Sequence, residues 1–184
     1  MSPDSPQPAV RPPHPLALEL IERLRSRPGA IVLEIGRGSG RNTRALEAAG
    51  FTVVDPGAQT AAAAALSTHA LLHGTPASIA ELLSTVAQLV EPNGAFYATF
   101  GSVRDARFGQ GVALAENVFA PEAGDESGVA HTYFTEDALR GMLERSWAIE
   151  SLEEVGVDEI AGSWAHRERP LAAAVHWFLR ARRR

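Results

Sequence analysis

The stretch "VLEIGRGSGRNT", residues 32–43, places three glycines at alternate positions where an apolar run gives way to a polar one. The apolar residues predict a short buried strand that ends at Gly36, and residues 41–50 predict a helix that ends at Gly50. In a parallel sheet, ligands bind beyond the carboxyl ends of the strands, and the first strand-to-helix turn commonly lies there. Glycines allow the backbone to approach a ligand closely, and the helix that follows presents free N–H groups. The stretch therefore predicts a nucleotide-type binding loop.

The spacing of these glycines helps to distinguish between cofactors. The dinucleotide fingerprint is G-x-G-x-x-G, whereas this loop reads G-x-G-x-G and has Arg41 where the third glycine of the fingerprint would stand. Glu34 lies two residues before the first glycine, and a carboxylate suits a ligand with a positively charged end. Both points favour S-adenosylmethionine over NAD. An NAD-dependent oxidoreductase and a glycine turn that binds nothing remain as alternatives.

The rest of the chain alternates between helical and strand patterns. Helices are predicted within residues 15–29, 41–50, 75–94 and 135–146, and strands within residues 30–36, 51–55, 64–74, 95–102, 147–157 and 172–182. This order predicts an α/β fold with a mainly parallel sheet that is covered on both faces and carries an antiparallel C-terminal hairpin. At 184 residues the chain has the size of one domain, which we expect to span residues 16–184. Residues 1–15 hold six of the twelve prolines and predict a flexible tail.

Composition argues against several functional classes. The chain has no cysteine, which excludes disulfides and thiolate metal sites, and its net charge of -5 argues against a nucleic-acid partner. No apolar run approaches the roughly 20 residues that cross a bilayer, so no membrane partner is expected. The N-terminus lacks the basic-then-apolar order of a signal peptide, and a cytoplasmic location is therefore predicted.

Four segments resemble a known family. "EIGRGSGRNTRALEAAGFTVV" resembles the first motif of class I S-adenosylmethionine-dependent methyltransferases, and "GSGRNT" followed by "ALSTHALLHG" resembles the tellurite-resistance-type small-molecule methyltransferases. "LVEPNGAFYATFGS" is similar to a later turn and strand of the family, and "HWFLRAR" to its last strand. The resemblance covers about residues 16–184. It implies a Rossmann-like fold, S-adenosylmethionine as cofactor, and methyl transfer to a small-molecule acceptor by in-line displacement.

The resemblance also implies roles for individual residues. The three loop glycines would pass beside the methionine part of the cofactor, Glu34 would hold its amino group, Asp55 would accept from the ribose hydroxyls, and the end of the third strand would line the cleft near the sulfonium. Arg37 departs from the small residues usual in this loop, and its charge is unfavourable beside a sulfonium unless it turns to solvent or pairs with an acid. The expected cofactor-binding residues are Glu34, Gly36, Arg37, Gly38, Gly40, Asp55, Ser67, Thr68 and His69.

The chain is contracted after Asp55 relative to this family. Only eight residues separate Asp55 from the strand expected at Ala64, whereas a parallel crossover needs about a dozen or more. Eight extended residues reach roughly 26 Å. We therefore expect residues 56–63 to run mostly extended, and the edge strand of the family, with its flanking helices, to be missing. Such a site would be more open on its adenine side, and the exposed sheet edge favours a homodimer. A non-catalytic protein of the same fold, acting as a binding or interaction module, is the alternative.

Residues 101–134 form a long segment without a clear periodic pattern, which is typical of lids and binding loops. The segment mixes charged and aromatic residues, and we interpret it as a cap over the acceptor; the alternative is a packed excursion whose charges pair with each other. A general base is needed only if the acceptor arrives protonated, and His69, His73 and His131 are the candidates. "HALLH" has the i, i+4 histidine spacing of zinc helices but lacks their glutamate, so no metal site is expected there.

Overall fold

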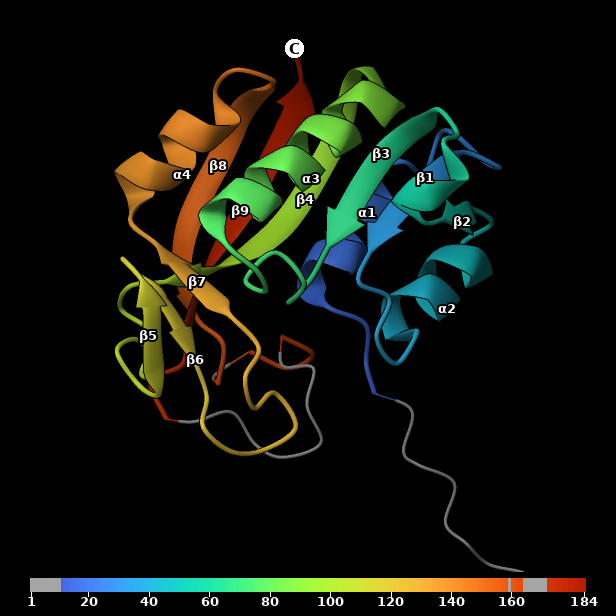
Figure 1. Ribbon diagram of the computed structural model, residues 1–184. Helices are drawn as coiled ribbons and strands as arrows, with labels where there is room; N and C mark the ends of the chain where they lie inside the picture. Colours follow the sequence, from blue (N-terminus) through green and yellow to red (C-terminus); the bar gives the residue numbers. More distant parts are fainter. Residues whose placement is uncertain (1–10, 159, 164–171) are drawn as a thin grey trace, which may run out of the picture.

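The computed structural model describes residues 11–158, 160–163 and 172–184. The helices are α1 (Pro15–Arg23), α2 (Arg41–Ala48), α3 (Pro76–Leu89) and α4 (Glu136–Leu143), with a 3-10 turn η1 (Pro56–Ala58). The strands are β1 (Ile31–Ile35), β2 (Thr52–Val54), β3 (Ala62–Ser67), β4 (Val90–Ser102), β5 (Val112–Ala115), β6 (Val118–Ala120), β7 (His131–Phe134), β8 (Trp147–Gly156) and β9 (Val175–Arg183) (Figure 1).

The predicted mainly parallel sheet is confirmed. Strands β2, β1, β3 and β4 lie side by side and run parallel, β9 pairs antiparallel with β4, and β8 pairs antiparallel with β9. Strand β4 continues past the end of β3, and there Gly101 and Ser102 pair in parallel with β7. The carboxyl ends of β1 and β3 therefore share one edge of the sheet with the start of the cap.

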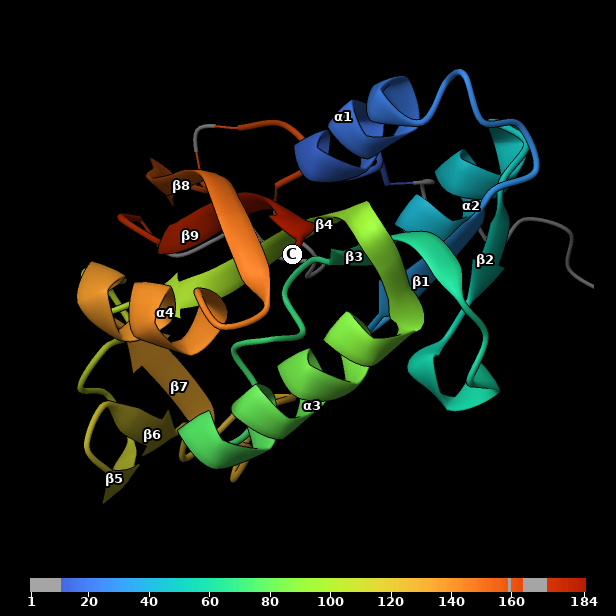
Figure 2. The same ribbon diagram turned by 90° about the horizontal axis from the view of Figure 1, so that it is seen from above.

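Two helical layers cover the sheet, and the alternation of side chains along β1 shows how. Leu33 and Ile35 pack in the cluster that includes the buried residues of α3 and α4, whereas Val32 packs in the cluster that includes α1 and α2. Figure 2 shows α1 and α2 on one side of the sheet and α3 and α4 on the other. Since side chains alternate along a strand, Glu34 faces the α1–α2 layer.

Helix α3 begins within the predicted range 75–94, and local capping fixes its start. Thr75 accepts from the Ser78 N–H and Ser78 accepts from the Thr75 N–H, so a capping box with Pro76 in the first turn begins α3. The first helix begins differently from the prediction, because its cap lies inside the segment expected to be a tail. His14 is fully buried and its ring accepts from the Leu16 N–H. The cap of α1 therefore extends one residue into the segment expected to be a tail, and residues 1–10 lie outside the described part of the chain.

The connection from β2 to β3, residues 55–61, differs in detail from the expectation. Residues 56–58 form a 3-10 turn, capped by Asp55, whose carboxylate accepts from the Gly57 N–H at 2.9 Å, so the predicted extended course is wrong there. Such a short crossover is feasible because β2 is short and β3 begins near the level where β2 lies. The three residues of β2 pair with residues 31–33 of β1, and Ala64 of β3 pairs with Val32 of β1. The chain thus returns by only about 10 Å along the strand and moves two strand spacings sideways. Within the described ranges, no strand pairs with the outer edge of β2.

Residues 101–134 are more regular than the sequence suggested. Strands β5 and β6 form an antiparallel hairpin, and β6 pairs with β7. This small sheet lies beyond the carboxyl edge of the main sheet (Figure 1). Among the described helices, none combines the length and the apolar character that a bilayer crossing requires.

Candidate functional site

The turn between β1 and α2 contains the three glycines, and all three adopt left-handed backbone angles. The φ values are 72° at Gly36, 49° at Gly38 and 71° at Gly40, which is the N-cap of α2. A side chain at Gly36 would overlap the β-carbon of Ala70, so packing within the protein is enough to explain that glycine. A β-carbon at Gly38 would meet no protein atom within 4 Å. The space above Gly38 is therefore open, as a ligand site requires.

A cavity of about 200 Å³ opens at this turn. It lies where β1 and β3 end and where α2 begins, which is the edge of the sheet at which the sequence predicts the cofactor. Four of the predicted residues line it, together with three that were not predicted to bind. The lining residues are Gly36, Arg37, Gly38, Ser39, Arg41, Asn42 and Thr68.

Glu34 lies next to this turn and is 2% exposed. The Thr43 hydroxyl donates to Oε2 of its carboxylate, while Oε1 is buried without a hydrogen-bond partner among the described residues. Burial raises the pKa of the Glu34 carboxyl, and the Thr43 hydrogen bond, the nearby Arg37 charge and the Asn42 side chain oppose that shift. A buried acceptor oxygen without a donor is costly. An ammonium group bound beside the loop would remove that cost, so this residue fits the predicted amino-group contact.

Arg37 and Asp55 both occupy the space beside the edge strand β2. Arg37 Nη2 donates to the Val53 carbonyl at 3.1 Å, so its charge is held at the end of β2 rather than paired with an acid or turned to solvent. Asp55 is exposed at the start of η1 and its carboxylate caps that turn. Its predicted ribose contact remains a proposal, because the side chain does not line the cavity.

Arg41 and Asn42, in the first turn of α2, were not predicted as site residues. Arg41 is 5% exposed, and its Nη1 donates to the carbonyls of Gly162 at 2.5 Å and Pro12 at 3.3 Å. Asn42 donates to the Thr68 hydroxyl at 2.9 Å and accepts from the His14 N–H at 2.8 Å. These bonds join distant segments around the cavity. The only sequence signal for them was their place in the first turn of the helix that follows the glycines.

The remaining predicted cofactor contacts on β3 have structural roles. Ser67 is fully buried and its hydroxyl donates to the Ile35 carbonyl at 3.4 Å. His69 has a left-handed φ of 61°, and its backbone N–H donates to the Thr99 hydroxyl at 2.8 Å. Its Nε2 donates to the Ser163 carbonyl, and burial lowers its pKa well below the usual range. His69 does not line the cavity at the glycine turn, so neither its predicted cofactor contact nor its candidate role as a base is supported by this geometry.

His69 instead belongs to a buried histidine cluster. Its ring centroid lies 5.6 Å from that of His14 and 4.9 Å from that of His176. Burial is the main cause that lowers the pKa of His14 to about 2 and that of His176 to about 3. All three rings are therefore neutral at neutral pH.

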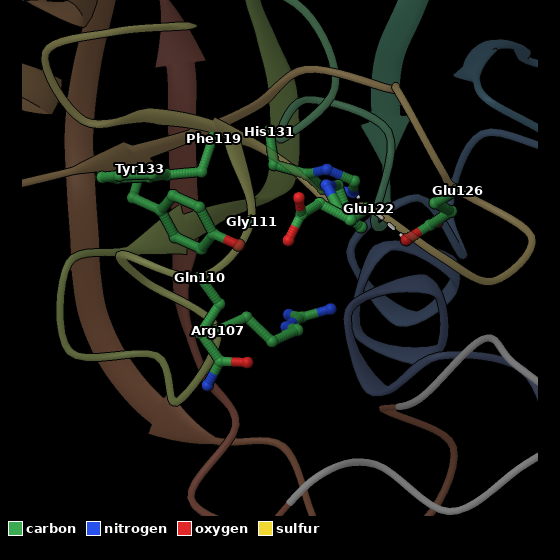
Figure 3. Close-up of a pocket in the computed structure, with 9 residues that line it drawn as sticks. Arg107, Gln110, Gly111, Phe119, Glu122, Glu126, His131 and Tyr133 are labelled. Atoms are coloured by element: carbon green, nitrogen blue, oxygen red, sulfur yellow. Dashed lines mark hydrogen bonds and ion pairs between the residues drawn. The ribbon is translucent and has the colours of Figure 1, made fainter. Parts of the chain in front are cut away.

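A second cavity, of about 270 Å³, lies within the predicted cap. Figure 3 shows the Arg107 guanidinium and the Tyr133 hydroxyl bordering it. Burial raises the pKa of Tyr133 to about 12, so its hydroxyl is a neutral hydrogen-bonding group at neutral pH. Arg107 makes a two-point ion pair with the buried Asp105, at 2.8 and 3.1 Å. Some charges of residues 101–134 thus pair with each other, as the packed-excursion alternative expects, but the segment also encloses a cavity, as a cap over an acceptor would. Its lining residues are Arg107, Gln110, Gly111, Phe119, Pro121, Glu122, Glu126, His131 and Tyr133.

The other two candidate bases lie together: His131 lines this cavity, and His73 packs against it from outside the lining set. Their ring centroids lie 4.9 Å apart, and Glu126 contacts both rings. Of the three predicted histidines, the structure thus brings two together with a carboxylate, and it places His69 in a separate buried cluster.

Comparison with known proteins gives likeness in structure alone. No protein-family model and no curated protein sequence matches the chain. Among solved structures, 1,6-didemethyltoxoflavin-N1-methyltransferase of Burkholderia thailandensis, with bound 1,6-didemethyltoxoflavin and S-adenosylhomocysteine, is similar over 92% of this chain and 76% of its own. The TM-score is 0.63 and the sequence identity 23%.

Two further solved structures show the same likeness. A SAM-dependent methyltransferase from Methanosarcina mazei gives a TM-score of 0.62 at 16% identity, covering 88% of this chain and 96% of its own. An S-adenosylmethionine-dependent methyltransferase from Mesorhizobium loti gives 0.61 at 18% identity, covering 91% and 98%. The chain therefore has the Rossmann-like fold of these methyltransferases.

Proposed function

We propose that this protein transfers a methyl group from S-adenosylmethionine to a small molecule. The observation that carries the proposal is the pairing of an open cavity over Gly38 with the buried, unpartnered Oε1 of Glu34. A ligand lying flush against the backbone with a cationic amino group would use both features. The likeness to methyltransferase structures, one of which holds S-adenosylhomocysteine and a small aromatic acceptor, supports this assignment.

In this proposal the chain mainly positions the reactants. S-adenosylmethionine supplies a methyl carbon on a sulfonium that departs as a neutral thioether, so little further activation of the donor is needed. Glu34 holds the amino group, the backbone at Gly36 and Gly38 lies along the methionine part, and Thr68 borders the sulfur. Orienting donor and acceptor can account for most of the rate enhancement of such a displacement.

The acceptor would enter from the cap cavity. Phe119 and Tyr133 offer aromatic surface there, and Arg107 and Gln110 offer hydrogen-bond donors. This combination suits a planar molecule with acceptor atoms at its rim. If the acceptor carries a proton, His131, which lines the cavity, or His73 beside it would accept that proton.

The open sheet edge belongs to the same proposal. With β2 outermost among the described strands, no strand covers the side where Asp55 would meet the ribose, so we expect the adenosine end of the donor to be more exposed than in methyltransferases with a further edge strand. Such an uncovered edge is what we expect of a tellurite-resistance-type methyltransferase that is contracted after Asp55. We also propose that a second copy of the chain covers this edge in a homodimer, and that the protein acts in the cytoplasm.

Calorimetric titration tests the proposed function. Saturable binding of S-adenosylmethionine and S-adenosylhomocysteine, with no heat from NADH, is the expected result. Binding of NADH alone would indicate an oxidoreductase. If neither sulfur ligand bound, the proposal would fail and a non-catalytic module would be the better description.

A further inference from the structure

We propose that His73, Glu126 and His131 form a binding site for a late first-row divalent metal ion, for which Zn²⁺ is the reference. This inference goes beyond methyl transfer and does not depend on it. His73 lies in the loop after β3, Glu126 in the loop between β6 and β7, and His131 at the start of β7. Their ligand atoms all lie within 4.8 Å of one another. Two imidazoles and one carboxylate are a donor set that zinc and its neighbours favour.

The carboxylate of Glu126 lies between the two rings. His73 Nε2 lies 3.2 Å from Glu126 Oε1, and His131 Nε2 lies 3.1 Å from Glu126 Oε2. Ligand atoms at about 2.0–2.1 Å from a tetrahedral ion are about 3.3 Å apart. The two contacts with Glu126 already have about this separation, and the limit of 4.8 Å on all three ligand atoms means that the side chains would have to close in further around one ion.

The backbone holds the two histidines in place. His73 and His131 face each other across an antiparallel bridge. On either side, the Thr132 N–H donates to the Leu72 carbonyl at 2.8 Å and the Gly74 N–H donates to the Ala130 carbonyl at 2.7 Å. The histidines are thus fixed by main-chain bonds and do not depend on flexible loops for their approach.

The hydrogen bonds of His131 strengthen the argument. Its Nδ1 lies 2.9 Å from the Val129 carbonyl, which can only accept, so Nδ1 carries a proton. The Nε2 atom of the same ring points to Glu126 Oε2 at 3.1 Å. Metal-bound histidines typically donate their other N–H to a carbonyl in this way, so the ring is oriented as a metal ligand would be.

The proposed ion would have an open position toward the cap cavity, because Glu126 and His131 both line that cavity. Three protein ligands with an open fourth position are typical of catalytic rather than structural zinc sites. The site would therefore take oxygen, nitrogen or sulfur donors of a small molecule. If the proposed methyl transfer is also correct, the ion would bind the acceptor atom and lower its pKa, in place of a histidine base.

The sequence predicts no metal site, so this proposal departs from that expectation. The i, i+4 spacing of "HALLH" joins His69 to His73, but His69 lies in the buried cluster with His14 and His176. His73 instead takes its proposed partners, Glu126 and His131, from the cap.

The test uses the full chain, freed of metal by chelation and titrated with Co²⁺ and then Zn²⁺ in the absence of S-adenosylmethionine. We expect one equivalent of Co²⁺ to give the intense visible absorption of a low-coordinate site, and Zn²⁺ to displace it. Glu126→Gln and His73→Ala should each weaken Zn²⁺ binding by about 100-fold or more, since even outer contacts change metal affinity by 10–100-fold. His73 is partly exposed, with 37% of its side chain accessible, so its removal should leave the fold intact.

Glu122→Gln is the matched control, because Glu122 lines the same cavity but is not among the three ligands. That variant should bind both ions as the unmodified protein does. A chain that takes up no Co²⁺ in excess, or Zn²⁺ binding that survives both Glu126→Gln and His73→Ala, would overturn the assignment. Because donor binding is measured separately, failure of the metal site is distinguishable from failure of the proposed methyl transfer.

Discussion

Replacing Gly38 by alanine separates the needs of a ligand from the needs of the fold. The residue has a φ of 49°, so an alanine there adopts a left-handed conformation that costs about 1–2 kcal/mol. The added methyl group meets no protein atom within 4 Å, so no packing clash increases that cost. The same methyl group projects into space that a bound S-adenosylmethionine would fill. Forcing an extra methyl into a well-packed contact costs about 1–3 kcal/mol, or roughly 5–150-fold in Kd.

Gly29→Ala provides the matched control. Gly29 has a φ of 77°, and a methyl group added there also meets no atom within 4 Å. This glycine precedes β1, however, and does not line the donor cavity. Both variants should therefore lose similar amounts of unfolding free energy. Only Gly38→Ala should weaken the binding of S-adenosylhomocysteine.

The assays are urea unfolding for stability and calorimetric titration for affinity. Equal affinity in the two variants would show that the loop is not the donor site. A much larger loss of stability in Gly38→Ala than in Gly29→Ala would show that the fold itself, and not a ligand, needs the glycine. Either result would refute the reasoning from the open space above Gly38.

Three further predictions concern Glu34, Gly36 and His14. Glu34→Gln should weaken S-adenosylmethionine binding by about 2 kcal/mol, roughly 30-fold in Kd, because a charge-assisted contact is lost. The same variant should have a higher free energy of unfolding at neutral pH, because the raised pKa of Glu34 means that its charged form disfavours folding. Gly36→Ala should lower stability by more than Gly29→Ala does, and adding Ala70→Gly should recover part of the loss by removing the overlap. Burial lowers the pKa of His14 to about 2, so its contribution to stability is complete above the unfolded value of about 6.5 and is lost as pH falls below it, by up to about 1.4 kcal/mol per pH unit. His14→Asn, which keeps a capping oxygen, should flatten that slope in unfolding measured between neutral and mildly acidic pH.

The parts of the fold that sequence predicts are those with local causes. Thr75 and Pro76 fix the start of α3, and the glycines after β1 mark the turn that borders the donor cavity. Strand β5 could not be found in the same way, because Val112–Ala115 is exposed throughout and lacks the alternation that marks a half-buried strand. The buried place of His14 depends on Asn42, a residue that no local pattern links to it. The proline-rich composition of residues 1–15 therefore gives no sign that His14 is buried.

The proposed metal ligands were beyond prediction for a related reason. Strand β4 extends beyond the end of β3, so Gly101 and Ser102 are free to pair with β7. This pairing brings His131, at the start of β7, next to His73 in the loop after β3. Strand length sets this contact, and strand ends are the least predictable feature of a sequence. The histidines were identified as candidates by their chemistry, but their partnership with Glu126 depends on how the sheet is completed.

The loop after β3 connects the two proposed sites. Thr68 lines the donor cavity, and His73 belongs to the proposed metal set. Between them, His69 is fixed through both its backbone and its ring, since its N–H donates to Thr99 and its ring donates to Ser163. A displacement reaction depends on the distance and angle between donor and acceptor, and a misplacement of about 1 Å can cost 10²-fold in rate. A short segment with a buried anchor in its middle would hold that geometry constant. The buried histidine is then best understood as a positioning residue, which explains why a side chain so near the proposed chemistry is tied into the core.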